Sequence, residues 1–101
     1  MEANFTDVFY KFLNTYKPVS RMLTSEDEID LISETLNLSE LDADERCRTR
    51  NEVVRYYNEL MDAEVIYDEN SQYKGRTDKY WDLVNSMNSI TSVIDYYRFL
   101  P

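Results

Sequence analysis

Seven of the eleven basic residues of this chain fall in two short stretches. Four arginines lie within residues 46–55 against the single acid Glu52, and three further cations follow within residues 74–79. A guanidinium group forms paired hydrogen bonds with phosphate or carboxylate, and a lysine offers a point charge to the same anions. The two stretches are therefore candidate anion-binding sites. The anion can belong to a ligand or to acidic side chains of the chain itself, since surface ion pairs are common.

The charge of the chain as a whole has the opposite sign. Its formal net charge is −9, which on average repels nucleic acid. The charge is segregated, however, because residues 18–45 hold nine acids and one arginine, a balance of −8, whereas residues 46–55 carry +3. Binding depends on the local field at the docking face, so a basic face can still bind a polyanion.

Several kinds of chemistry are excluded by residue types. The chain has no histidine, one cysteine (Cys47) and one glycine (Gly75). This composition leaves no zinc site, no histidine-based triad and no glycine-rich phosphate loop. Cys47 is expected to be a small buried residue at a tight turn, since no histidine can activate it. We therefore expect no enzyme activity, no metal and no cofactor.

Length and hydropathy set the class of protein. A chain of 101 residues predicts a single domain over residues 1–101. We expect a soluble, cytoplasmic protein without membrane contact, because neither a signal peptide nor a long apolar run is present. Few glycines and prolines favour helices.

Apolar side chains at steps of three and four residues predict the helices that must position these cations. The predicted helices are an extra one at about 5–16, one from Thr24 or Ser25 to near Asn37, a short one capped by Ser39 and containing Leu41 and Ala43, one at about 50–62 and a last one at about 84–99. Residues 47–49 form the turn before the fourth helix, and Thr49 with Glu52 forms its capping box, as Ser25 and Glu28 do for the second. Tyr57 is expected in the core.

Two strands are predicted between the last two helices. Residues 63–67 contain a β-branched run, and residues 80–83 read as the returning strand. A polar, turn-rich stretch over residues 68–75 separates them. Together they predict a β-hairpin.

This succession resembles the winged helix-turn-helix superfamily of transcription regulators. The likeness covers about residues 25–83 and rests on the stretches SEL (39–41), TRNEVVR (49–55) and NELMDAEVI (58–66). In that superfamily a scaffold helix, a turn, a recognition helix and a strand entering the wing follow in this order. The resemblance implies a mainly α fold with a small β-hairpin wing, with additional N-terminal and C-terminal helices.

The resemblance also implies a function, DNA-binding transcription regulation. The helix at about 50–62 would enter the major groove of double-stranded DNA, where Arg50 suits guanine and Asn51 suits adenine. The residues expected to contact phosphates or the neighbouring groove are Arg46, Arg48, Thr49, Arg55, Lys74, Arg76 and Lys79.

A homodimer would place two recognition helices on half-sites about one helical turn apart. The stripe of the last helix has nearly heptad spacing, so it can pair with a second subunit together with the first helix. The expected dimer interface consists of Phe5, Phe9, Phe12, Met87, Ile90, Ile94 and Tyr97.

A second hypothesis uses the acidic residues instead. An acidic protein-binding winged helix could bind a basic protein partner, either as an adaptor of the transcription machinery or as a virus-type inhibitor whose acidic face imitates nucleic acid. The −8 balance of residues 18–45 is its main support.

Overall fold

The computed structural model describes the backbone of residues 2–18 and 25–98 and the side chains of residues 7–18 and 25–97. Its elements are α1 (Glu2–Thr15), α2 (Glu26–Thr35), the 3-10 turn η1 (Leu38–Glu40), α3 (Ala43–Asp62), β1 (Val65–Tyr67), β2 (Tyr73–Arg76) and α4 (Asp78–Arg98). The described residues are therefore mainly helical with one small antiparallel hairpin, and this coarse prediction is confirmed.

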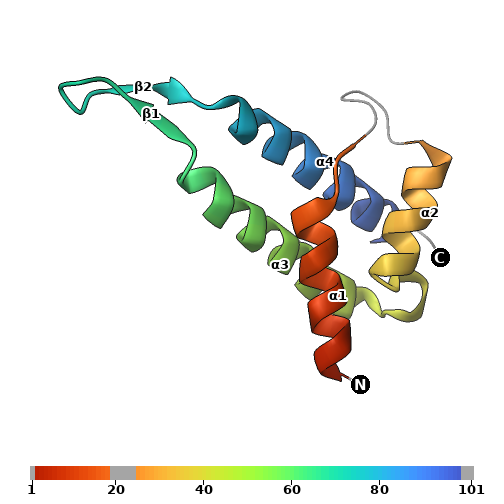
Figure 1. Ribbon diagram of the computed structural model, residues 1–101. Coiled ribbons are helices and arrows are strands. Elements are labelled where there is room, and N and C mark those ends of the chain that lie inside the picture. The colour runs from red at the N-terminus through yellow and green to blue at the C-terminus, as the bar shows by residue number, and fades with distance from the viewer. Residues whose placement is uncertain (1, 19–24, 99–101) are drawn as a thin grey trace.

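The molecule is elongated, with extents of 53 × 31 × 21 Å. α3 and α4 run in opposite directions as its two long sides, and the β1–β2 hairpin joins them at one end (Figure 1). α1 and α2 lie toward the other end, where α1 crosses α3 and α2 packs against α4 (Figure 1). In the described part of the chain, no helix combines the length and the apolar character needed to span a membrane.

α3 is one uninterrupted helix of 20 residues. The Asp42 carboxylate accepts a hydrogen bond from the Glu45 N–H at 2.8 Å, and the Glu45 carboxylate accepts one from the Asp42 N–H at 3.1 Å. This capping box fixes the start of the helix. The turn predicted at residues 47–49 is wrong, because the Thr49 hydroxyl donates to the Glu45 carbonyl at 2.9 Å within the helix and caps nothing. Cys47 is consequently exposed, not buried at a turn.

α2 is capped by Ser25, one of the two starts that the sequence predicted. The Ser25 side chain caps it by accepting a hydrogen bond from the Glu28 N–H at 3.2 Å. The Glu28 carboxylate is buried and accepts a hydrogen bond from the Tyr16 hydroxyl at 2.6 Å, which fastens α2 to the end of α1. After α2, Asn37 adopts a left-handed conformation. The separate short helix predicted from Ser39 is wrong, because Ser39 lies within the 3-10 turn η1 and Ala43 already begins α3.

The hairpin is shorter than predicted. Its returning strand is β2, and the strand predicted at residues 80–83 is wrong because those residues belong to the first turns of α4. The Asp68 carboxylate closes the loop early by accepting hydrogen bonds from the N–H groups of Asn70 and Gln72 at 2.8 and 2.9 Å. The Thr77 hydroxyl then accepts a hydrogen bond from the Tyr80 N–H at 3.2 Å, so α4 starts directly after the hairpin.

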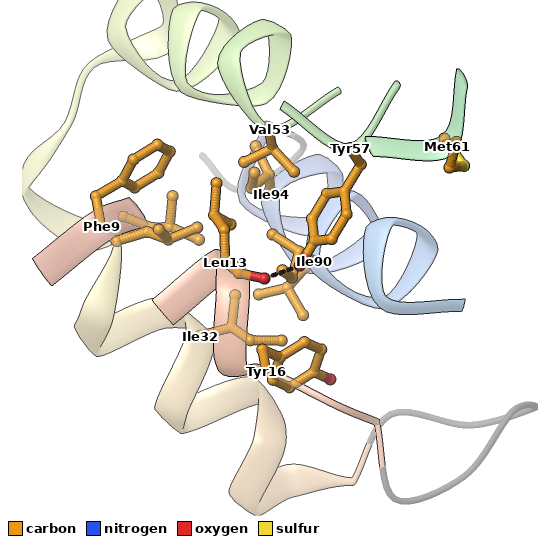
Figure 2. Close-up of a cluster of buried hydrophobic side chains, with 12 residues drawn as sticks. Phe9, Leu13, Tyr16, Ile32, Val53, Tyr57, Met61, Ile90 and Ile94 are labelled. Atoms are coloured by element: carbon orange, nitrogen blue, oxygen red, sulfur yellow. Dashed lines mark hydrogen bonds between the residues drawn. The ribbon is translucent and has the colours of Figure 1, made fainter. Parts of the chain in front are cut away.

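The core lies where α1, α2, α3 and α4 meet (Figure 2). Its buried apolar residues are Phe9, Leu13, Tyr16, Ile32, Leu36, Leu38, Val53, Tyr57, Met61, Ile90, Val93 and Ile94. Most described residues of the apolar stripes predicted for the first helix and for α3 lie in or against it, but Val8 of the first stripe is exposed. Tyr57 is in the core as expected, and its hydroxyl donates to the Leu13 carbonyl at 2.8 Å (Figure 2). This hydrogen bond joins α3 to α1.

The proposed dimer residues lie differently from the prediction. Phe9, Ile90 and Ile94 are buried in the protein's own core, so they cannot present a surface to a second copy. Three others, Phe12, Met87 and Tyr97, are partly buried and pack against the same core. The side chain of Phe5 falls outside the described residues. The heptad-like spacing of the last helix thus reflects packing within one chain, and the homodimer itself stays a prediction.

The continuity of α3 predicts the effect of a proline at its exposed position 48. Arg48→Pro removes a helical N–H and places its ring against the preceding turn, so we expect a loss of about 3 kcal/mol in the free energy of unfolding. Urea denaturation followed by circular dichroism measures it. Arg48→Ala is the control and is expected to stay within about 0.5 kcal/mol of the wild type. Equal stability of the two variants would indicate a turn and contradict the continuous helix.

Alkaline pH is expected to destabilise the fold. Burial raises the pKa of Tyr57 above its ordinary value of 10.0, and burial together with the hydrogen bond to Glu28 raises the pKa of Tyr16. Both tyrosines therefore contribute stability that is complete below pH about 10 and is lost as the pH rises toward their raised folded-state pKa values.

Urea denaturation at a series of pH values tests this effect. Tyr57→Phe is expected to cost about 1 kcal/mol at neutral pH, because the Leu13 carbonyl loses its donor. The same variant is expected to weaken the alkaline decline, since phenylalanine cannot ionise. Tyr67→Phe, at an exposed position, is the control. An identical alkaline decline in both variants would show that Tyr57 does not contribute to it.

Candidate nucleic-acid interface

Arg46 holds three elements together. Its Nε donates to the Leu38 carbonyl at 3.1 Å, and its Nη1 donates to the Tyr97 carbonyl at 2.9 Å. The guanidinium carbon also lies 5.6 Å from the centre of the Tyr97 ring. A helix leaves its last carbonyls without partners, and a cation is favourable near that end. The contacts of Arg46 are therefore those of a clamp between η1, α3 and the last turn of α4.

Arg50 and Arg55 are both engaged in ion pairs. The Nε of Arg50 lies 2.8 Å from a carboxylate oxygen of Asp95 on α4, and the two side chains are about one third exposed, at 35% and 36%. Arg55 donates to Glu52 and to Glu59 on its own helix. Each of these pairs contributes little stability on its own. They do, however, offset the positive charge that the sequence assigned to this helix.

Glu52 and Tyr10 belong to the network around Arg55. The Tyr10 hydroxyl, on α1, donates to the Glu52 carboxylate. Hydrogen bonds from Arg55 and Tyr10 lower the pKa of Glu52, and the hydrogen bond to Glu52 raises the pKa of Tyr10. The negative charge of Glu52 is thus stabilised beside Arg55, and α1 is fastened to α3 by the same contacts.

The two cations of the hairpin, Lys74 and Arg76, also interact with groups of the protein itself. The Nζ of Lys74 lies 3.7 Å from the Asp68 carboxylate across the hairpin. Arg76 donates to the Met61 carbonyl at 2.8 Å, and its guanidinium carbon lies 4.7 Å from the centre of the Tyr80 ring. Arg76 therefore fixes the base of the hairpin to the end of α3 and to the first turns of α4.

Arg48, Asn51 and Lys79 are exposed and, unlike Arg55 and Lys74, which are exposed too, form no ion pair with a described residue. Asn51 makes one weak contact, 4.0 Å from its Nδ2 to the Cys47 sulfur. Arg48 and Lys79 have no hydrogen bond or ion pair with the described residues. Arg48 lies in the second turn of α3, whereas Lys79 lies at the hairpin end of α4, so about 20 Å of helix separates their levels. The structure therefore does not gather the predicted cations into one basic surface.

The acidic residues of α2 other than Glu28, unlike most of the predicted DNA-binding cations, are exposed and have no ion pair with a described residue. The helix carries five acids and no basic residue, and Glu26, Asp27, Asp30 and Glu34 are exposed. None of these four has an ion pair with a described residue. Their charge therefore acts on the solvent and on any partner that approaches this side of the molecule.

A cleft of about 490 Å³ opens between α2 and the C-terminal half of α4. Its lining residues are Glu26, Ile29, Asp30, Ser92, Val93 and Tyr96. Most of the exposed lining is apolar, and Tyr96 is 61% exposed. Sequence reasoning missed this site. The spacing of Ser92 and Tyr96 shows a shared helix face, but no local signal shows that this face meets α2.

No protein-family model matches the chain, and neither a curated protein nor a solved structure shows significant similarity to it. The winged helix-turn-helix resemblance therefore stays a prediction from the sequence.

Arg46 and Arg48 allow a direct test of the structural assignment. Arg46→Met is expected to lower the free energy of unfolding by about 1.5 to 3 kcal/mol, because two carbonyls lose a charged donor. Arg48→Met removes the same charge at an exposed site and is expected to change it by less than about 0.5 kcal/mol. Thermal and urea denaturation of both variants measure the difference. Equal free energies of unfolding in the two variants would show that Arg46 does not stabilise the fold. Arg46 would then again be a candidate ligand-binding residue.

Proposed function

We propose that this protein is an acidic protein-binding module whose α2 face docks on a basic surface of a partner protein. The observation that carries the proposal is the contrast between the two kinds of charge. Glu26, Asp27, Asp30 and Glu34 are exposed without ion pairs, whereas most of the cations near α3 are engaged within the molecule. A one-signed exposed face speeds encounter with an oppositely charged partner and orients it.

The role of such a module is that of an adaptor or an inhibitor. Its acids would occupy the basic surface of the partner, in the way that a nucleic acid or an acidic protein does. The net charge of −9 adds to the steering, because the whole chain attracts a basic partner while it repels polyanions. The attachment of α2 to the end of α1 supports the same role, since the buried Tyr16–Glu28 hydrogen bond helps to hold the acidic face in place.

DNA binding by α3 is the second candidate function. It is favoured by the exposure of Arg48 and Asn51 on the outer side of α3, which leaves both side chains free to reach a groove. Arg50, the expected guanine contact, would first have to give up its ion pair with Asp95.

Binding of fluorescent poly-L-lysine at low and moderate salt tests the first proposal. An Asp27→Lys, Glu34→Lys variant is expected to bind about tenfold more weakly than the wild type. The matched control is Asp62→Lys, Glu69→Lys, which changes the net charge equally but lies near the hairpin. Equal losses in the two variants would mean that net charge, not the α2 face, governs binding.

Random duplex DNA serves as the second probe in the same assay. The wild type is expected not to bind it even at low salt. Salt-sensitive DNA binding that is lost in an Arg48→Ala variant would contradict the proposal and support readout by α3 instead.

A further inference from the structure

The cleft between α2 and α4 combines an apolar floor with an acidic wall. Ile29 and Val93 form its apolar part, and Tyr96 stands at its rim with most of its surface exposed. Glu26 and Asp30 lie one helical turn apart on the α2 side. A cavity of about 490 Å³ falls in the size range that holds small ligands or several side chains of a docked segment.

Charge identifies the chemistry of the occupant. Among the described lining residues none is basic, and both charged ones are acids without an ion pair to a described residue. A docked acidic segment would place like charges together, whereas a purely apolar segment would leave Glu26 and Asp30 desolvated without a counter-charge. A segment with apolar residues on one side and lysines or arginines beside them satisfies both parts of the cleft.

We infer that this cleft is the docking site of a basic amphipathic segment of a partner protein, with an aliphatic or aromatic anchor seated on Ile29, Val93 and Tyr96 and cations facing Glu26 and Asp30. This is helix-in-groove recognition, in which apolar anchors recur at helical spacing. The inference rests on the proposed function, because it specifies where on the acidic side a basic partner is held and what its sequence must contain.

The open shape of the site suits a protein segment. The lining comes from two helices whose packing is fixed by the core, since Val93 lies beside Ile94 and Ile90 in α4 and Ile29 packs against the same cluster. A preformed cleft loses little conformational entropy on binding. The exposed ring of Tyr96 then supplies the kind of aromatic contact that dominates many interfaces.

The experiment compares two labelled synthetic peptides by fluorescence anisotropy. One is an amphipathic helical peptide of leucine and lysine, and the other has serine in place of every leucine and the same charge. The leucine peptide is expected to bind at least about tenfold more tightly, which corresponds to one well-seated apolar anchor. Binding of neither peptide would overturn the proposed function, whereas equal binding of both would overturn only the cleft.

Two variants of matched exposure locate the site. Tyr96→Ser removes the aromatic ring at the rim of the cleft, and it is expected to lower the affinity for the leucine peptide about tenfold. Tyr67→Ser is the control, because Tyr67 is 62% exposed but lies in the hairpin. Equal affinities of the two variants would exclude the cleft.

A measurement on the wild type covers the case in which Tyr96→Ser does not fold. Titration with the leucine peptide is expected to shift the backbone amide resonances of Ile29, Ser92 and Tyr96 in NMR spectra. Shifts confined to the hairpin or to α1 would place the peptide elsewhere and overturn the inference.

Discussion

The antiparallel packing of α3 on α4 is the constraint on which the other parts of this protein depend. Val53, Tyr57 and Met61 lie on one side of α3 and belong to the same buried cluster as Ile90 and Ile94 of α4. Burial of these side chains supplies the main driving force for folding. Once the two helices are in contact, the hairpin must connect their ends. The remaining buried face of α4 is then available to α2, which produces the cleft.

The packing of α3 on α4 also determines which groups two of the arginines of α3 contact. Because α3 lies against α4 along much of its length, Arg46 reaches the carbonyl end of α4 and Arg50 reaches Asp95. Arg55 is held by the carboxylates one turn before and after it on α3. The cationic cluster that stands out in the sequence is therefore largely offset in three dimensions. The four exposed acids of α2, in contrast, have no ion pair with a described residue.

The sequence predicted the helical class, Ser25 as one of two possible caps of α2, the core position of Tyr57 and the presence of a hairpin. These features depend on local signals: apolar spacing, a serine cap and a β-branched run. The start of α3 was not predicted, because Asp42 with Glu45 and Thr49 with Glu52 are equally plausible capping boxes in sequence. The earlier start is held by the contacts of Arg46 with the Leu38 and Tyr97 carbonyls, which only the fold brings within reach.

The second strand and the candidate site needed information that no short stretch contains. Tyr80 and Trp81 favour strands by type, yet the Asp68 loop closes early enough for β2 to end before them. Likewise, the arginines form a cluster in sequence, but their partners Tyr97 and Asp95 are about fifty residues away and become neighbours only through the fold. The cleft could not be predicted from a short stretch either, since its two walls, α2 and α4, are separated in sequence by the whole of α3 and the hairpin.

The connection of α3 to α4 through so short a hairpin also bears on the order of folding. Residues 43–98 form a contiguous segment, and closing a small loop costs little chain entropy. The contact from Arg76 to the Met61 carbonyl, next to the hairpin, spans only 15 residues, and packing of α3 on α4 can extend from there, whereas the contact between Tyr57 and Leu13 spans 44. Local contacts form sooner than distant ones, so the α3–hairpin–α4 unit is expected to form the folding nucleus. α1 then docks on a surface that already exists, and the acidic cleft is completed only when α2 has followed it.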